Sequence, residues 1–135
     1  FKTPYINTVQ STDVNGVQYA AVLKNVYALG TGIANGLGYG DNFQSVLIAN
    51  AAGEMERFLK TIAPDKSIQY AASVYLGDLL VTCYSLFSRN RSFGNMIGKG
   101  YSVEAAKISM IKTSEGNAQA RLIEAAGEAD RLSRI

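Results

Sequence analysis

The feature that most constrains the fold is a helical face built from small residues. From Val17 onward the sequence follows the i, i+3, i+4, i+7 spacing of an α-helix. The face that this spacing defines consists of Val17, Ala20, Ala21, Lys24, Ala28 and Thr31. Apart from Lys24 it offers no side chain to solvent that is both long and charged. The sequence therefore predicts a helix that packs with this face against other elements and carries one lysine at its centre.

A second helix is predicted to begin at Asp41, after a stretch of glycines. Asp41 and Gln44 have the spacing of a capping box, and Ala63-Pro64 ends the pattern. Its apolar stripe is expected at Phe43, Val46, Leu47, Ala51, Phe58 and Ile62. The glycines between Gly30 and Gly40 lack the G-x-G-x-x-G spacing and follow a helix instead of a strand, so we interpret them as a sharp turn with close backbone packing.

The remaining chain is predicted to be helical except at its start. Further helices are expected over Ser67–Tyr84, from about Ser88, over Ser102–Ile111 and over Asn117–Arg134. Phe1–Val9 alternates loosely and is predicted to be a single strand, whose sheet partners would lie outside this chain segment because one strand cannot form a sheet. We predict a mainly α fold, with residues 1–12 as strand and linker and residues 13–135 as a helical domain.

Composition excludes several classes of function. The chain has 135 residues and a net charge of +2, which is too small to favour a nucleic-acid partner. It contains no histidine, so acid–base chemistry falls to other side chains. Cys83 is the only cysteine, which excludes a cysteine-cluster zinc site, and we expect no metal ion. A lone thiol fits a reducing compartment, so a cytoplasmic location is expected, and no apolar run is long enough for a membrane span.

Lys24, Asp78 and Thr82 are the first candidates for chemistry. A lysine at the centre of a small apolar face either extends its ammonium group to solvent or donates and accepts protons. Asp78 lies among apolar residues and needs a cationic partner, for which Lys24 is one candidate, unless it is a partly exposed helix residue. Thr82 lies one helical turn after Asp78, although a threonine there also satisfies its own helix backbone.

The segment Ser88-Arg89-Asn90-Arg91 is the sharpest local motif. Ser88 can cap the helix that follows, and the N-terminus of a helix offers free backbone N–H groups to an anion. Arginine adds a planar group that can hold two phosphate oxygens, and Asn90 can hydrogen-bond a hydroxyl group. The motif indicates either a site for a small phosphorylated ligand or a solvated basic turn.

Three segments in this order resemble one family. "GVQYAAVLKNVYALGTGIANGLGYGDN", "LGDLLVTC" and "SRNRSFGNMIGKGYSVEAA" are similar to the helical C-terminal domain of bacterial-type NAD(P)-dependent glycerol-3-phosphate dehydrogenase. The resemblance covers Asp13 to Ala106 and is weak over residues 117–135. It implies reversible reduction of dihydroxyacetone phosphate to sn-glycerol 3-phosphate for glycerophospholipid synthesis. It also implies NAD or NADP bound mainly by an N-terminal Rossmann domain, and a possible homodimer.

The resemblance implies a role for each residue of the substrate site. Lys24 matches the catalytic acid/base of the family, and Asn25 beside it helps to shape the site. Asp78 matches the aspartate that binds the glycerol part and interacts with the lysine, and Thr82 matches a position that lines the site.

For the phosphate and the cofactor, the resemblance implies a second set of residues. Ser88, Arg89 and Asn90 match the motif that holds the substrate phosphate and glycerol. Arg89 also approaches the nicotinamide cofactor in the family, and Thr113 and Glu115 match positions on the cofactor side. Two other hypotheses remain open at this point: a helical dimerisation or scaffold domain without chemistry, and the substrate domain of a related hydroxyacid dehydrogenase.

Overall fold

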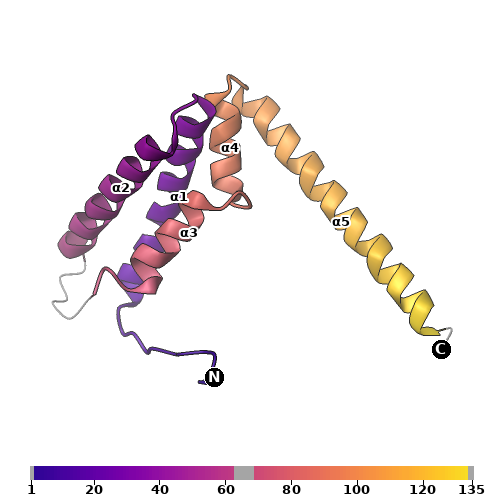
Figure 1. Cartoon of the computed structure of the whole chain (residues 1–135), viewed down its shortest axis with the longest axis horizontal. Helices are drawn as coiled ribbons and strands as arrows, with labels where there is room; N and C mark the ends of the chain where they lie inside the picture. The colour runs from indigo at the N-terminus through magenta and orange to yellow at the C-terminus, as the bar shows by residue number, and fades with distance from the viewer. Residues whose placement is uncertain (1, 63–68, 134–135) are drawn as a thin grey trace.

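The structure is a computed structural model that describes the backbone of residues 2–62 and 69–133 and the side chains up to Ala125. It confirms the mainly α fold (Figure 1). Its elements are α1 (Val14–Gly36), α2 (Asp41–Ile62), the short π-helix η1 (Ser73–Gly77), α3 (Asp78–Tyr84), α4 (Arg89–Gly98) and α5 (Val103–Ser133). Helix α1 lies at the centre with α2, α3 and α4 around it, and α5 projects away from this bundle.

Close contact between two backbones fixes α4 against α1. A Cβ atom on Gly32 of α1 would lie 2.1 Å from the carbonyl oxygen of Arg91, and one on Gly94 of α4 would lie 2.2 Å from that of Leu29. Gly36 and Gly98 are equally tight against the facing backbone. The predicted close packing is therefore confirmed, although α1 continues through the first glycines and the turn comes later, with Gly38 at φ +90°.

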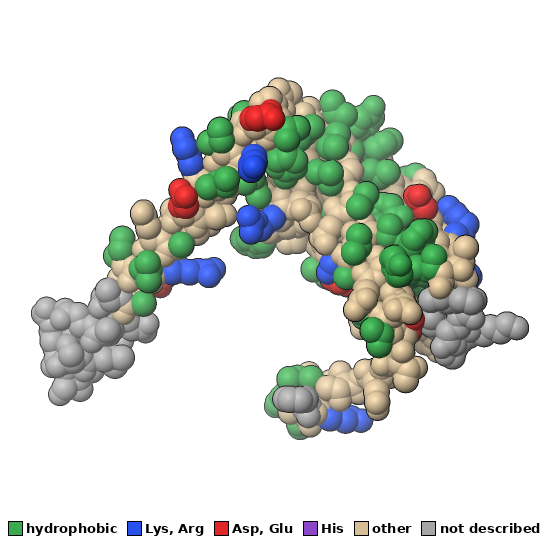
Figure 2. Space-filling model, turned by 180° about the vertical axis from the view of Figure 1, so that it is seen from behind, with side chains coloured by type: hydrophobic (Ala, Val, Ile, Leu, Met, Phe, Trp, Pro, Cys, Tyr) green, Lys and Arg blue, Asp and Glu red, His purple; other side chains and the backbone are tan. Residues whose placement is uncertain are grey.

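The core lies between α1, α2 and α3. Its buried residues are Ala20, Ala28, Ile48, Met55, Leu59, Tyr75, Leu79 and Cys83. The small face of α1 packs as predicted, with Thr31 buried beside the alanines. The solvent-accessible side of the bundle still carries many apolar groups, which Figure 2 shows in green.

The predicted stripe on α2 is wrong by about one position. The buried face of α2 is Gln44, Ile48, Ala51, Met55 and Leu59, and of the predicted stripe only Ala51 belongs to it. Two predicted core aromatics form surface pairs instead, Phe43 stacked on Tyr39 and Phe58 edge-on to Tyr19. Because α2 has two apolar stripes, its sequence alone does not determine which stripe faces α1.

The capping box at the start of α2 is also wrong. The Gln44 side chain is buried and donates a hydrogen bond to Asn35 Oδ1 of α1 at 2.9 Å. It therefore does not turn back toward Asp41, and the backbone N–H of Gln44 donates to Gly40 O. A partner on another helix has replaced the local capping contact that the spacing suggested.

The boundaries of the later helices differ from those predicted. The expected Ser67–Tyr84 helix is formed only from Ser73 as η1 followed by α3, and Ser67 lies outside the described residues. The helices predicted over Ser102–Ile111 and Asn117–Arg134 are one helix, α5, because Gly116 does not interrupt it; Arg134 lies outside the described residues. A glycine in a helix costs only about 1 kcal/mol, too little to break it without a proline. No helix in the described part of the chain has the length and apolarity of a membrane span.

The strand predicted over Phe1–Val9 is not formed. Residues 2–13 contain no helix or strand, and Phe1 lies outside the described residues. A strand requires a neighbour that accepts and donates its backbone hydrogen bonds, and nothing in the described chain provides one. The proposed boundary at residue 13 stays a prediction.

Candidate functional site

Lys24 and Asp78 form a direct ion pair between α1 and α3. The distance from Lys24 Nζ to Asp78 Oδ2 is 2.5 Å, and the side chains are 23% and 40% exposed. The small residues around Lys24 on α1 allow α3 to approach this closely. The predicted cationic partner of Asp78 is thus Lys24. An ion pair this exposed contributes at most about 1 kcal/mol to stability.

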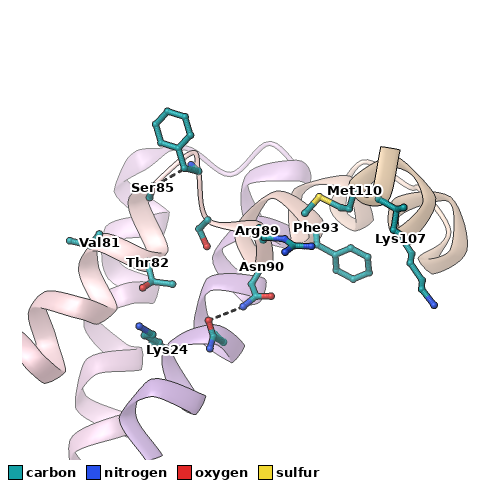
Figure 3. Close-up of a pocket in the computed structure, with 13 residues that line it drawn as sticks. Lys24, Val81, Thr82, Ser85, Arg89, Asn90, Phe93, Lys107 and Met110 are labelled. Atoms are coloured by element: carbon teal, nitrogen blue, oxygen red, sulfur yellow. Dashed lines mark hydrogen bonds between the residues drawn. The ribbon is translucent and has the colours of Figure 1, made fainter. Parts of the chain in front are cut away.

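The Thr82 side chain bonds its own helix and also lines the pocket. Its hydroxyl group donates to the Asp78 carbonyl oxygen of its own helix at 2.7 Å, as the backbone-satisfying interpretation requires. The same side chain lines the pocket that contains Lys24 (Figure 3). Thr82 therefore forms part of the pocket wall near the ion pair, with its hydroxyl group bonded to its own helix.

The start of α4 brings the Ser-Arg-Asn motif to the same pocket. Ser88 caps α4, because its Oγ accepts the Arg91 N–H at 3.4 Å, which confirms the predicted cap. Asn90 Nδ2 donates to Asn25 Oδ1 of α1 at 2.8 Å, the dashed line beside Asn90 in Figure 3. Asn25 in turn donates to Ala21 O. This chain of hydrogen bonds connects the N-terminus of α4 to Asn25, the residue that follows Lys24 in α1.

An open pocket of about 790 Å³ joins these residues. Six of the seven predicted substrate residues line it. The seventh, Asp78, does not line the pocket but accepts a hydrogen bond from Lys24, which does. The complete lining is Lys24, Asn25, Val81, Thr82, Ser85, Phe87, Ser88, Arg89, Asn90, Phe93, Lys107, Met110 and Ile111. Figure 2 shows the hollow between α5 and the bundle, in which basic side chains are visible.

Charge is distributed unevenly along the pocket. At one end Lys24 is neutralised by Asp78. At the other end lie Arg89 of α4 and Lys107 of α5, and neither forms a salt bridge within the described residues. This end, next to the capped N-terminus of α4, is therefore the one that favours an anion.

Sequence reasoning missed the α5 side of the pocket. Lys107, Met110 and Ile111 come from the first turns of α5, which pack on α4. Their i, i+3, i+4 spacing was a usable signal, but it does not indicate which helix the face contacts. Phe87 and Phe93, which flank the Ser-Arg-Asn motif, were also missed.

The structure does not bring Thr113 and Glu115 to this pocket. Both are exposed on α5, and Thr113 Oγ1 donates to the Ser109 carbonyl oxygen of its own helix at 2.9 Å. Arg89 is the one predicted cofactor residue that lines the pocket. The cofactor roles of Thr113 and Glu115 stay predictions.

Cys83 lies beneath the site and has the character of a small buried hydrophobe. Burial raises the pKa of its thiol above the ordinary value, while a hydrogen bond with Thr31 and the charge of Arg91 lower it by less. The thiol is fully buried in the core. The raised pKa keeps it protonated near neutral pH, so it does not act as a nucleophile there.

Fold and site together define a helical domain with a paired lysine at one end of a pocket and, at the other end, an arginine beside a helix N-terminus. Residues 13–133 match the family described as NAD-dependent glycerol-3-phosphate dehydrogenase C-terminus. The chain belongs to this family.

Relatives and solved structures agree with this assignment. The chain is 39% identical over 123 residues to glycerol-3-phosphate dehydrogenase [NAD(P)+] of Syntrophomonas wolfei, which is 91% of this chain and 36% of the relative. It is 46% identical over 100 residues to the enzyme of Pelotomaculum thermopropionicum, covering 74% of this chain and 28% of the relative. The chain thus spans about a third of the length of these curated relatives.

Two solved structures of glycerol-3-phosphate dehydrogenases have the same fold over this domain. Glycerol-3-phosphate dehydrogenase from Coxiella burnetii matches with a TM-score of 0.67 at 30% identity, over 83% of this chain and 37% of that one. The enzyme from Saccharomyces cerevisiae matches with a TM-score of 0.72 at 29% identity, over 82% and 32%. The helical bundle is therefore the architecture of this family's C-terminal domain.

Proposed function

We propose that this chain provides the substrate site of an NAD(P)-dependent dehydrogenase that interconverts dihydroxyacetone phosphate and sn-glycerol 3-phosphate. The observation that carries the proposal is one pocket with two different ends. A lysine held by an aspartate lies at one end. At the other end lie a helix N-terminus and an arginine that forms no salt bridge with the residues described. A three-carbon ketone with a phosphate group at one end needs this combination.

At the anion-binding end, Ser88, Arg89 and Asn90 hold the phosphate. The N-terminus of α4 offers backbone N–H groups and the positive end of its dipole, and Arg89 adds a planar donor pair for two phosphate oxygens. Asn90 is oriented by its hydrogen bond to Asn25, so its position relative to Lys24 is fixed. Binding energy gained here orients the carbonyl group toward the reacting end.

At the reacting end, Lys24 donates a proton to the ketone oxygen. NAD(P)H supplies the hydride when it is bound. As the carbonyl oxygen gains charge, a proton moves from Lys24 Nζ to it and gives the hydroxyl group, and in the reverse direction Lys24 takes the proton back. Asp78, 2.5 Å from Nζ, orients the ammonium group and balances its charge. General acid catalysis of this kind accounts for roughly 10²- to 10⁴-fold of the rate.

The described residues can contact the nicotinamide end of the dinucleotide, but they do not offer a site for its pyrophosphate. Arg89, with the apolar side chains of Phe93 and Met110, can contact the nicotinamide end. Within the described chain, no glycine-rich turn between a strand and a helix is present to hold the pyrophosphate. We propose that most cofactor contacts come from a separate domain, with Thr113 and Glu115 as further contacts from this one.

The remaining proposals concern the protein in the cell. The apolar side chains exposed around the α1–α2 turn, Leu37, Tyr39, Phe43 and Val46, support a homodimer. The free thiol of Cys83 supports a reducing compartment, and hence the cytoplasm. The product, sn-glycerol 3-phosphate, is the backbone from which glycerophospholipids are made.

Titration of the chain with sn-glycerol 3-phosphate tests the proposed site. We expect the amide NMR signals of residues 88–91 to shift at millimolar ligand, and the shifts to disappear in Arg89→Ala. One charge-assisted hydrogen bond is worth about 1.5–3 kcal/mol, or roughly 10- to 150-fold in affinity, with less from an exposed site. Arg121→Ala, on the exposed part of α5, is the matched control and should leave the shifts unchanged. Signals that do not move in the wild-type chain would contradict the phosphate site.

A further inference from the structure

Besides the Lys24–Asp78 pair, a second side-chain hydrogen bond connects the start of α1 to η1, the segment directly before α3. Asp13 is the N-cap of α1, and its Oδ1 accepts the Gly16 N–H at 2.9 Å. Its other oxygen, Oδ2, accepts the hydroxyl group of Tyr75 at 2.5 Å. Tyr75 is 4% exposed and lies in η1. One carboxylate thus caps α1 and connects it to η1.

The space for this carboxylate depends on Gly16. A Cβ atom at residue 16 would lie 1.9 Å from Asp13 Oδ2 and 2.6 Å from Asp13 Cγ. Gly16 is itself buried, so an added side chain has no free direction. The position of the Asp13 carboxylate is therefore closely determined by the residues around it.

A shift of Tyr75 is expected to move Asp78, because Tyr75 lies in the short π-helix that directly precedes Asp78. Residues Ser73–Gly77 form the π-helix, and Asp78 follows directly as the first residue of α3. The Asp78 N–H donates to the carbonyl oxygens of Ser73 and Tyr75, so the backbone of Asp78 is hydrogen-bonded directly to that of Tyr75. π-helical turns often occur at functional sites.

The two contacts lie far apart on α1. Asp13 and Lys24 are separated by about 16 Å along the helix axis at 1.5 Å per residue. Apolar packing of Tyr75, Leu79 and Cys83 in the core already holds the η1–α3 segment against α1, and the two polar contacts add directional restraints at positions far apart along the helix. Loss of the hydrogen bond at Asp13 should therefore change the geometry at Lys24 without removing either catalytic partner.

We infer that Asp13 and Tyr75 are positioning residues that hold η1 and α3 in the orientation that brings Asp78 to Lys24. The inference about geometry stands on the contacts above, and its consequence for the substrate rests on the proposed function. Neither Asp13 nor Tyr75 lines the pocket that contains Lys24, so both act through Asp78.

The first experiment uses the ligand-free chain. Tyr75→Phe keeps the ring and removes only the hydroxyl group. Tyr84→Phe is the matched control, because its hydroxyl group bonds Ser45 of α2 and not α1. The readout is the ¹³Cε–¹Hε NMR signal of Lys24, assigned by its loss in Lys24→Met. We expect Tyr75→Phe to shift this signal and Tyr84→Phe to leave it unchanged. A Lys24 signal that is the same in wild type and Tyr75→Phe would overturn the inference.

The second experiment compares two ligands. Inorganic phosphate needs only the anion-binding end, whereas sn-glycerol 3-phosphate also needs the Lys24–Asp78 end. In Tyr75→Phe we expect affinity for sn-glycerol 3-phosphate to fall about two- to tenfold, the effect of one hydrogen bond, with phosphate binding unchanged. An equal loss for both ligands would indicate general destabilisation and contradict positioning. If wild type binds neither ligand, the proposed function fails, while the Lys24 signal still decides the inference.

A second variant separates positioning from helix capping. Asp13→Ser keeps a good N-cap acceptor for the Gly16 N–H, but its short side chain does not reach Tyr75. We expect it to move the Lys24 signal in the same direction as Tyr75→Phe. If Asp13→Ser moves the signal and Tyr75→Phe does not, the effect arises from the lost carboxylate charge and not from the contact with Tyr75, and the inference is wrong.

Discussion

Gly94→Ala is expected to destabilise the chain by roughly 1–3 kcal/mol, the typical cost of overpacking a closely packed contact. The added Cβ would lie 2.2 Å from the Leu29 carbonyl oxygen and 3.0 Å from the Ile33 nitrogen. Both are backbone atoms of α1, so no rotamer change relieves the contact, and α4 must move away from α1. The measurement is the free energy of unfolding from urea titration followed by circular dichroism.

Gly30→Ala is the matched control for this prediction. Gly30 is an exposed residue of α1, and nothing lies within 4 Å of a Cβ placed on it. Alanine should stabilise the helix there by about 0.5–1 kcal/mol. Equal stability of Gly94→Ala and wild type would mean that α1 and α4 are not in backbone contact, and the placement of Ser88–Asn90 beside Lys24 would lose its support.

Lys24→Met is expected to lower kcat by roughly 100-fold or more, because it removes the proton donor. The assay uses a chimera in which residues 13–135 follow the N-terminal part of the Syntrophomonas wolfei relative. Methionine has a similar length, and Asp78, left without its partner, is exposed enough to be hydrated. The fold should therefore persist, which circular dichroism checks, and kcat should fall more than KM rises.

Lys99→Met controls for the loss of one positive charge. Lys99 is exposed at the end of α4 and does not line the pocket, so its loss should change kcat less than twofold. A Lys24→Met enzyme with kcat close to that of wild type would remove Lys24 from the acid/base role.

Features that depend on local chemistry could be predicted from the sequence. The helical spacing around Lys24 and the cap at Ser88 need only the residues next to them, and both are confirmed. The pairing of Asp78 with Lys24 spans 54 residues, yet Lys24 could be named as a candidate because a carboxylate among apolar residues favours a cationic partner.

Features that depend on distant partners could not be predicted. Gln44 has the spacing of a capping residue, but its buried partner is Asn35 of another helix. The segment before Asp13 has strand-like alternation, but alternation does not supply a neighbouring strand. The contribution of α5 to the pocket was missed for the same reason, because the packing of Lys107 and Met110 beside Phe93 is set by tertiary contacts with α4.

The central claim is that this pocket holds a phosphorylated three-carbon ketone between Lys24 and Arg89. The most direct test measures NAD(P)H oxidation by the chimera with dihydroxyacetone phosphate and with dihydroxyacetone, which lacks the phosphate. We expect turnover of the phosphorylated ketone, a kcat/KM at least about 10-fold lower for dihydroxyacetone from the loss of the charge-assisted contacts, and no turnover by residues 1–135 alone. A folded chimera that uses both ketones equally well, or turnover by the isolated chain, would contradict the claim.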